Sequence, residues 1–366
     1  MILCEVRNRV AFITLNRPAA LNALNLDMIV QLRTALREFA EDPKVNAVLI
    51  RGAGEKAFCA GGDIRAIYER AKTAHSVQLD FFVTEYPLDY LLYSYPKPYV
   101  ALIDGIVMGG GMGISQGSTL RIVGDRTRMA MPEVAIGFFP DVGASYFLSR
   151  LEGALGLYLA LTGVQIRAAD AVYTGLADMY LPPASMGRLE TELAALAWDD
   201  DRSKDPRTAI EGVIQVLAGT APPAPLAAIR PAIDAHFSAP SVSAVFESLE
   251  GESRPEFAEW ARQTVDLMHT RSPTMLAVTW EQLTRGKSLS LAECLRMELG
   301  LVRQAFYQGD FMEGVRAMII DKDNAPVWRP PHIEDVTPEM VAAMFTDPWA
   351  GAEHPLAHLE GVHACS

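Results

Sequence analysis

A run of glycines, Met108-Gly-Gly-Gly-Met-Gly113, constrains the fold of this chain more than any other feature. It follows the apolar stretch Tyr99–Ile103, which has the length and composition of a buried strand, and it precedes a segment of helical character. Glycine allows backbone conformations and close approaches that a Cβ atom would forbid. The run therefore predicts a sharp strand-to-helix turn, with outward-pointing N–H groups at the positive end of the helix dipole.

Strand and helix patterns alternate along the first half of the chain. Residues 4–15 indicate a hairpin, and residues 26–41 carry apolar side chains at helical spacing behind Asn25, a plausible N-cap. Further strands are expected at residues 47–50, 99–103 and 120–123, and further helices at 64–74, 79–93 and from Gly109 onward. This alternation predicts an α/β fold with crossover connections.

The strand patterns fade beyond about residue 185, where loop-forming Asp and Pro residues become common. Residues 255–320 look helical, and Ser272-Pro273 is typical of a helix start. We therefore expect three parts: a core over residues 1–195, a helical C-terminal region over 196–345, and a loose tail over 346–366.

Composition narrows the class of protein. Half of the 366 residues are hydrophobic and the net charge is −13, which is typical of a globular chain and argues against a nucleic-acid partner. The most apolar region, residues 99–114, is too short and too rich in glycine to cross a membrane. The four cysteines lie far apart without zinc-site spacing, so we expect free thiols, no metal site and, with no signal peptide evident, a cytoplasmic location.

Two carboxylates, Glu133 and Asp141, lie eight residues apart in a segment that also contains Phe138 and Phe139. Each carboxylate has a simple explanation as an acid that stabilises a helix N-terminus. In an apolar setting, however, burial raises the pKa of a carboxyl group toward values useful for proton transfer. Backbone donors in the two glycine clusters, 60–63 and 108–113, would suit an oxyanion, so the combination indicates acyl-thioester chemistry.

These segments together resemble the enoyl-CoA hydratase/isomerase, or crotonase, superfamily. The resemblance rests on residues 16–24, 56–64 and 109–111, and the longer segments 81–86, 97–111, 131–151 and 310–328 look like the branch that hydrolyses 3-hydroxyisobutyryl-CoA. It implies a core of repeated ββα units that form a spiral of two sheets, with a helical C-terminal region. It also implies an acyl-CoA substrate, no separate cofactor because CoA belongs to the substrate, and a homo-oligomer as one compatible state.

The resemblance also implies roles for particular residues. Glu133 would be the main catalytic carboxylate and Asp141 its partner, while the backbone N–H groups of Gly62 and Gly110 would form the oxyanion hole. Substrate binding would involve Glu85, which would orient a 3-hydroxyl group, together with Gly110, Glu133 and Asp141. CoA binding would involve Arg17, Lys56, Ala60 and Ile64.

Several of these residues have simpler alternatives. From the residues alone, Glu85 is more simply a solvated acid on a helix, and Arg17 and Lys56 are more simply surface cations. For Asp63 we favour the simple interpretation, a cap for the helix that begins at Ile64.

Gly113 distinguishes between reactions. The hydratases that this chain resembles carry a glutamate at the matching position, and dienoyl-CoA isomerases carry an aspartate. Without that carboxylate, half of the hydratase acid/base pair is missing. We therefore expect hydrolysis of a short β-hydroxyacyl-CoA such as 3-hydroxyisobutyryl-CoA, an intermediate of valine catabolism. The alternatives are an enoyl-CoA hydratase or isomerase and a non-catalytic CoA-thioester-binding protein, and the sequence leaves open whether Glu133 acts as nucleophile or as base.

Overall fold

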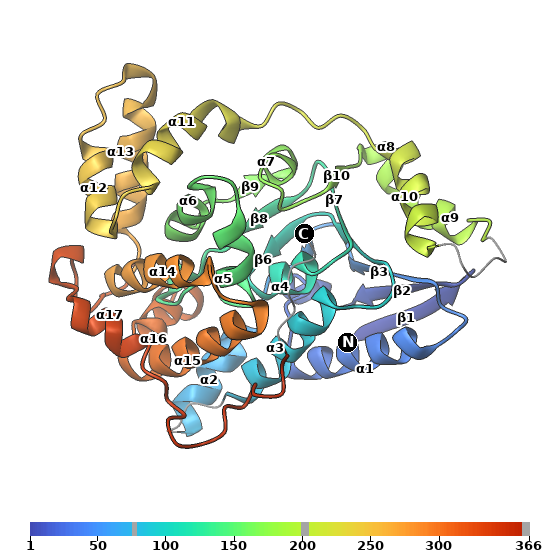
Figure 1. Ribbon diagram of the computed structural model, residues 1–366, viewed down its shortest axis with the longest axis horizontal. Coiled ribbons are helices and arrows are strands. Elements are labelled where there is room, and N and C mark those ends of the chain that lie inside the picture. Colours follow the sequence, from blue (N-terminus) through green and yellow to red (C-terminus); the bar gives the residue numbers. More distant parts are fainter. Residues whose placement is uncertain (75–78, 199–204, 361–366) are drawn as a thin grey trace. The chain divides into compact units, whose positions relative to one another are not determined.

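The computed structural model describes residues 1–74, 79–198 and 205–360. The chain forms two compact units, each assembled from separate stretches of sequence (Figure 1). Unit 1 comprises Met1–Gly62, Leu88–Met129 and Ile166–Ala227. Unit 2 comprises Asp63–Pro87, Ala130–Gln165 and Ala228–Ser366, so both units draw on residues from either side of position 195.

Unit 1 is built on a six-stranded sheet with the order β1-β2-β3-β5-β7-β10. The first two strands form the expected antiparallel hairpin, and the other neighbouring strands pair in parallel, as crossover connections require. The strands are β1 (Ile2–Arg7), β2 (Val10–Leu15), β3 (Ala47–Gly52), β5 (Tyr99–Ile103), β7 (Leu120–Val123) and β10 (Met179–Tyr180).

A second, four-stranded sheet has the order β4-β6-β8-β9. Its strands are β4 (Ala57–Cys59), β6 (Ile106–Met108), β8 (Arg128–Ala130) and β9 (Ile166–Arg167). None of these strands is expected from the sequence. Strands of two or three residues carry too little periodicity to be recognised, and only their pairing makes them strands.

Two helices of unit 1, at residues 26–41 and from Gly110 onward, lie where the sequence predicts them. Helix α1 (Leu26–Glu41) begins where Asn25 accepts a hydrogen bond from the Met28 N–H, so the predicted N-cap is confirmed. One apolar face of the large sheet packs against side chains of α9 and α10, including Leu189, Leu193 and Ile210. The remaining helices of this unit are η1 (Pro18–Ala20), α4 (Gly110–Gln116), α7 (Ala168–Tyr173), α8 (Pro183–Met186), α9 (Leu189–Ala194) and α10 (Pro206–Leu217).

Unit 2 is almost entirely helical. Ser272 caps α14 by accepting from the Met275 N–H, as its sequence predicts. Its helical elements before residue 200 are α2 (Ile64–Ala74), η2 (Glu133–Ile136), α5 (Ala144–Phe147), η3 (Leu148–Arg150) and α6 (Leu155–Thr162). Later come α12 (Val242–Glu250), α13 (Pro255–His269), α14 (Pro273–Gly286), α15 (Leu291–Gln308), α16 (Phe311–Val315), a π-helical turn η4 (Arg316–Ile320), η5 (Ile333–Asp335) and α17 (Pro338–Met344). Helices α3 (Asp80–Tyr93) and α11 (Pro225–Phe237) contribute residues to both units.

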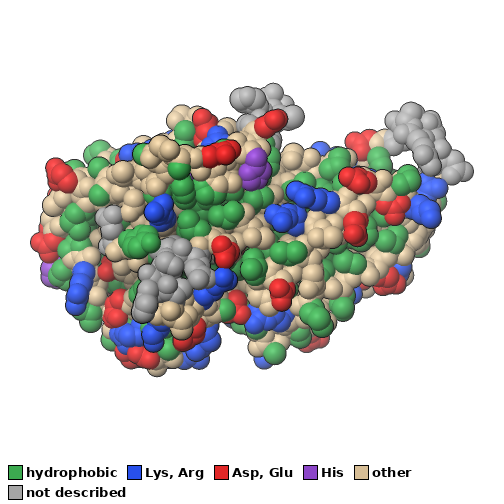
Figure 2. Space-filling model, turned by 90° about the horizontal axis from the view of Figure 1, so that it is seen from below, with side chains coloured by type: hydrophobic (Ala, Val, Ile, Leu, Met, Phe, Trp, Pro, Cys, Tyr) green, Lys and Arg blue, Asp and Glu red, His purple; other side chains and the backbone are tan. Residues whose placement is uncertain are grey.

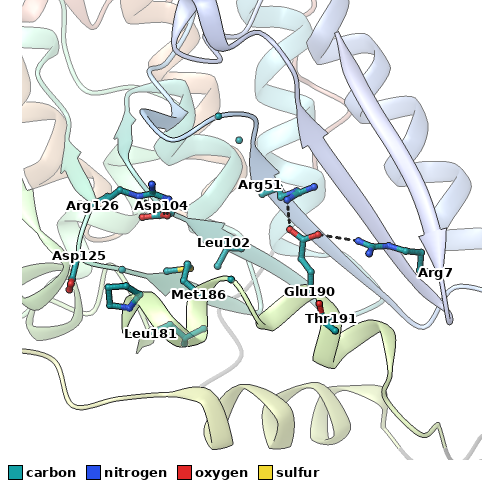
Figure 3. A pocket seen from close by; sticks show the side chains of 15 residues that line it. Arg7, Arg51, Leu102, Asp104, Asp125, Arg126, Leu181, Met186, Glu190 and Thr191 are labelled. Atoms are coloured by element: carbon teal, nitrogen blue, oxygen red, sulfur yellow. Dashed lines mark hydrogen bonds and ion pairs between the residues drawn. The ribbon is translucent and has the colours of Figure 1, made fainter.

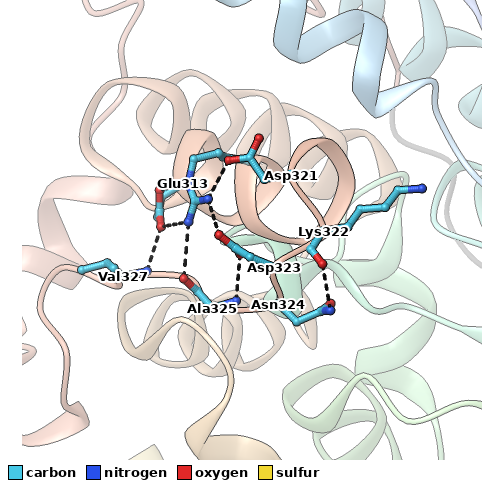
Figure 4. A network of polar contacts seen from close by, with 8 residues as sticks. Glu313, Asp321, Lys322, Asp323, Asn324, Ala325 and Val327 are labelled. Atoms are coloured by element: carbon cyan, nitrogen blue, oxygen red, sulfur yellow. Dashed lines mark hydrogen bonds and ion pairs between the residues drawn. The ribbon is translucent and has the colours of Figure 1, made fainter.

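A dense network of polar contacts holds the segment that follows α16 (Figure 4). The Arg316 guanidinium donates to Glu313, Asp321 and Asp323 at 2.6–2.8 Å. Glu313 also accepts from the Val327 N–H at 2.9 Å. The network therefore folds residues 321–327 back onto α16, which itself contacts the η2 turn.

The sequence predicts a loose tail over residues 346–366. Through residue 360 the structure shows a chain packed on α15: Leu356 and Leu359 are buried, and Arg303 and Arg296 donate to the carbonyl oxygens of Pro348 and Leu359 at 2.9 Å. Residues 361–366 lie outside the described part of the chain.

Candidate active site

The glycine run forms a strand-to-helix turn, as predicted, but the strand before it is the unexpected β6 rather than β5. Gly109 adopts φ 48° and ψ −121°, a conformation open only to glycine, and Gly110 begins the helix. Because the first N–H groups of a helix have no partner within it, the Gly110 N–H is available to a ligand. A Cβ at Gly111 would lie 2.2 Å from the Cys59 carbonyl oxygen, so glycine is what lets α4 approach β4.

The second glycine cluster lies directly beside this turn, within the same unit. Gly61 has φ +99°, and a Cβ there would lie 3.0 Å from the Met108 oxygen and 3.5 Å from the Gly110 nitrogen. Its carbonyl accepts from the Leu24 N–H at 2.8 Å, and Leu24 forms a parallel bridge with Gly62. The two loops that carry Gly62 and Gly110 are thus neighbours, which favours the oxyanion-hole assignment that the sequence predicts.

The predicted catalytic acids are buried in unit 2. Glu133 begins the η2 turn and is 7% exposed, Asp141 is 6% exposed, and Glu85 on α3 is 2% exposed. Glu85 is therefore not the solvated helical acid that its alternative interpretation requires. Within the described residues, one carboxyl oxygen of Glu133 and one of Glu85 have no hydrogen-bond partner. Buried polar atoms are nearly always paired in proteins, so oxygens of this kind are expected at a site that receives a ligand.

A tyrosine to which the sequence analysis gave no role holds Asp141. The Tyr86 hydroxyl, buried on α3, donates to Asp141 Oδ2 at 2.8 Å. The two residues are 55 positions apart, so only the folded chain shows this contact. The one sequence signal that could have found Tyr86 is its place beside Glu85, in the segment 81–86 that carries the family resemblance.

Burial raises the pKa of each of these carboxyl groups, so they are weaker acids than usual. Desolvation raises the pKa of Asp141 to about 7, although the Tyr86 hydrogen bond acts in the opposite direction. The pKa of Glu133 lies well above its usual range because of burial and, secondly, the nearby Asp141 charge, and the pKa of Glu85 is raised by the same two causes. A cluster of this kind holds protons near neutral pH and is able to exchange them, which is what general acid/base catalysis requires.

The structure also shows the surroundings of Asp63 and of the four residues predicted to bind CoA. Asp63 Oδ1 accepts from the Ala66 N–H at 3.2 Å, which confirms it as a cap of α2. Arg17 donates to the Ala23 carbonyl at 2.9 Å, Lys56 is exposed, and Ala60 and Ile64 are partly exposed. These four residues remain predicted CoA contacts.

A cavity of about 610 Å³ opens elsewhere in unit 1 (Figure 3). Glu190 of α9 reaches into it and pairs with Arg7 at 3.0 Å and with Arg51. Its lining residues include none of the predicted site residues, and its arginines are already matched by carboxylates. This cavity therefore gives no support to an active site of its own.

The fold and these residues define a protein of the crotonase class. The sequence profile of the enoyl-CoA hydratase/isomerase family matches residues 10–345, and the chain belongs to that family. Solved structures agree: a carnitinyl-CoA dehydratase from Mycobacterium thermoresistibile aligns with TM-score 0.86 and 39% identity over 95% of this chain and 97% of that chain. An enoyl-CoA hydratase from Rhodobacter sphaeroides aligns with TM-score 0.83 and 36% identity over the same shares. The predicted fold, a crotonase-like core with a helical C-terminal region, is confirmed.

Similar curated proteins bear a more particular name. The mitochondrial 3-hydroxyisobutyryl-CoA hydrolase of Xenopus laevis is 43% identical over 342 residues, which cover 91% of this chain and 86% of that protein. The human protein of the same name is 39% identical over 92% of this chain and 86% of its own length.

These names correct one expectation. The sequence predicts a cytoplasmic protein, whereas the similar hydrolases are named as mitochondrial, so the cytoplasmic prediction is wrong. It rested on the absence of a recognisable signal peptide, and that absence carries no information about delivery to an organelle.

Proposed function

We propose that this protein hydrolyses the thioester of a short β-hydroxyacyl-CoA, with 3-hydroxyisobutyryl-CoA as its substrate. The observation that carries the proposal is the identity of about 40% with hydrolases of that name over some nine-tenths of the chain. The buried acids and glycine turns supply groups suited to this chemistry. In the reaction, water adds to the thioester carbonyl, the C–S bond breaks, and the sulfur leaves as the free thiol of CoA once it is protonated.

In this proposal, the oxyanion-hole glycines and the three buried acids each have a role in the reaction. The N–H groups of Gly62 and Gly110 stabilise the oxyanion that forms on the carbonyl, a contribution worth about 3–4 kcal/mol per donor in other enzymes. Glu133 either attacks the carbonyl or activates the water, and Asp141 holds or returns a proton. Glu85 binds the 3-hydroxyl group, which suits a buried carboxyl oxygen that has no partner among the described residues.

The main rival is addition of water to an enoyl-CoA, because the two aligned solved structures are titled as a dehydratase and a hydratase. Gly113 argues against it. This residue lies inside α4, is buried and has no side chain, so it offers no carboxylate to act together with Glu133. Hydration requires both deprotonation of water and protonation of the α-carbon, for which related hydratases use two glutamates.

One assay separates the two reactions. The purified protein is given 3-hydroxyisobutyryl-CoA and crotonyl-CoA, and free thiol and enoyl absorbance are followed in parallel. We expect thiol release from the first substrate and little loss of enoyl absorbance from the second. Loss of enoyl absorbance without thiol would establish the hydratase instead, and binding of both CoA esters without turnover would indicate a non-catalytic CoA-binding protein.

We further propose a role in valine breakdown, with acyl-CoA as the only small-molecule partner and no separate cofactor or metal. A nucleic-acid partner is not expected, since the net charge is −13 and Figure 2 shows acidic and basic side chains interspersed on the face in view. No helix in the described part of the chain is long and apolar enough to cross a membrane. A homo-oligomer remains compatible with the family.

A further inference from the structure

Glu298 is a buried acid that the proposed chemistry does not use directly. It lies on α15 with no exposed surface. Its two carboxyl oxygens accept from the Gly143 N–H at 2.8 Å and from the Ser145 N–H at 2.9 Å. These contacts join positions about 155 residues apart in the sequence, and no sequence pattern indicated them.

The turn that Glu298 holds begins immediately after Asp141. Val142 has φ +54° and Gly143 has φ +87°, so two successive residues adopt the left-handed conformation. This conformation is unfavourable for a β-branched residue such as Val142 and persists only where surrounding contacts enforce it. The paired hydrogen bonds to Glu298 are such contacts, since they fix the N–H groups of Gly143 and Ser145 just after the strained residue.

A second side chain holds the other side of Asp141. Gln282 of α14, also without exposed surface, donates to the Pro140 carbonyl oxygen at 2.5 Å and to the Ser145 hydroxyl at 2.8 Å. The backbone is therefore fixed both before and after Asp141, while its carboxyl group receives the Tyr86 hydrogen bond. Both anchoring side chains come from the helical C-terminal region.

We propose that Glu298 is a positioning residue for thioester hydrolysis, which acts by holding the turn from Val142 to Ser145 so that the Asp141 carboxyl group keeps its place. The inference rests on the proposed function, because it assumes that Asp141 takes part in hydrolysis. A carboxyl group suits the task because it offers two acceptor oxygens to two converging N–H groups.

Other titratable groups lie near Glu298. The groups that face it are Asp141, the Tyr86 hydroxyl and Cys294 one turn earlier on α15, and Arg150 and Glu293 in turn act on Cys294. Burial raises the pKa of Glu298 to about 8, and the neighbouring Asp141 charge adds to that effect. Because the pKa of Asp141 is about 7, Asp141 ionises first, while Glu298 is still largely protonated.

The test compares Glu298→Gln with Glu298→Asp. Glutamine keeps the shape but replaces one acceptor oxygen with an amide donor, which then opposes one of the two N–H groups. We expect kcat to fall by about 10², with KM nearly unchanged, because a misplacement of about 1 Å costs that much. We also expect the limb of the pH–rate profile that reports Asp141 to move to higher pH, because a displaced Asp141 loses the Tyr86 hydrogen bond that lowers its pKa. Aspartate keeps both acceptor oxygens but is one methylene shorter, so kcat and the limb should change less than in Glu298→Gln.

The matched control is Glu281→Gln on α14, where the carboxylate pairs with Arg285 near the surface and is worth little. It should leave kcat and the pH profile unchanged. Circular dichroism and binding of a non-hydrolysable CoA thioether establish that each variant is folded. If Glu298→Gln does not fold, Gly143→Ala replaces it, since its left-handed backbone at φ +87° disfavours a side chain and a lower kcat is expected.

The inference is overturned if folded Glu298→Gln keeps the wild-type kcat and pH profile, if Gly143→Ala used in its place keeps the wild-type kcat, or if Glu281→Gln loses as much activity. A wild-type protein that releases no thiol overturns the proposed function itself, and this inference with it. Wild-type turnover with an unaffected Glu298→Gln variant overturns the inference alone.

Discussion

At the scale of single residues, Glu133 combines the features expected of a catalytic carboxyl group. It is almost fully buried, one of its oxygens has no partner among the described residues, and its pKa lies well above the usual range through burial and the Asp141 charge. An acid that merely stabilised the start of the η2 turn would gain more from remaining in solvent, where its charge is hydrated.

Glu133→Gln should therefore leave binding of a CoA thioether nearly intact and reduce turnover by about 10²–10⁴, since it keeps the size of the side chain and removes the titratable group. Thiol release measures turnover, and calorimetry measures binding. A variant with near-normal turnover would show that Glu133 is a structural acid after all.

Glu85 supports a second prediction at this scale. If its carboxyl group binds the 3-hydroxyl of the substrate, Glu85→Gln should weaken kcat/KM for 3-hydroxyisobutyryl-CoA by about 3- to 10-fold, since a hydrogen bond between uncharged groups is worth about 0.5–1.5 kcal/mol. Isobutyryl-CoA, which lacks that hydroxyl, serves as the comparison. Equal losses on both substrates would exclude recognition of the hydroxyl by Glu85.

At the scale of elements, the glycine turn depends on how closely α4 packs on β4. A Cβ at Gly111 would lie 2.2 Å from the Cys59 carbonyl oxygen, so any side chain there pushes the helix away from the strand. The displacement would also move Gly110, the residue whose N–H is predicted to bind the oxyanion.

Gly111→Ala should thus destabilise the protein by about 1–3 kcal/mol through overpacking and should reduce kcat as well. Gly212→Ala on α10 is the matched control, because nothing lies within 4 Å of its Cβ position. In the interior of a helix that control should stabilise by about 0.5–1 kcal/mol and leave kcat alone. Thermal unfolding and thiol release measure both effects, and a Gly111→Ala protein as stable and active as wild type would refute the packing argument.

At the scale of the whole molecule, the buried acids make stability depend on pH. The pKa of Asp141 is raised to about 7 and that of Glu298 to about 8, whereas in the unfolded chain both titrate near pH 4. Between these limits the native state binds more protons than the unfolded state, so the free energy of unfolding falls as pH rises. The stabilising contribution is complete below about pH 4 and is lost as pH rises through the native pKa values.

We expect the melting temperature to fall steadily from pH 5.5 to pH 8.5, with a shallower fall in Asp141→Asn, which lacks one of the two groups. For Asp141 alone the effect is on the order of 4 kcal/mol at most. Calorimetry at constant ionic strength measures both slopes. A melting temperature that rises over this range, or an identical slope in the variant, would mean that Asp141 is ionised in the native state throughout.

Much of this architecture could be predicted because its causes are local in the sequence. The hairpin at residues 4–15, the caps at Asn25 and Ser272 and the strand-to-helix turn at Gly109 each depend on a few adjacent residues, and the structure has them where they were expected. The buried acids and the glycine loops were likewise recognisable as motifs of the family.

What the sequence by itself determined, then, is the class of fold and the kinds of chemical group at the site. Only the tertiary structure decided which groups meet. The short strands β4 and β6 exist through pairing, Tyr86 reaches Asp141 across 55 positions, and Glu298 reaches Gly143 across 155. The physical reason is that burial and hydrogen bonding depend on distance in space, so an acid acquires its altered pKa and its partners only when remote segments exclude water around it.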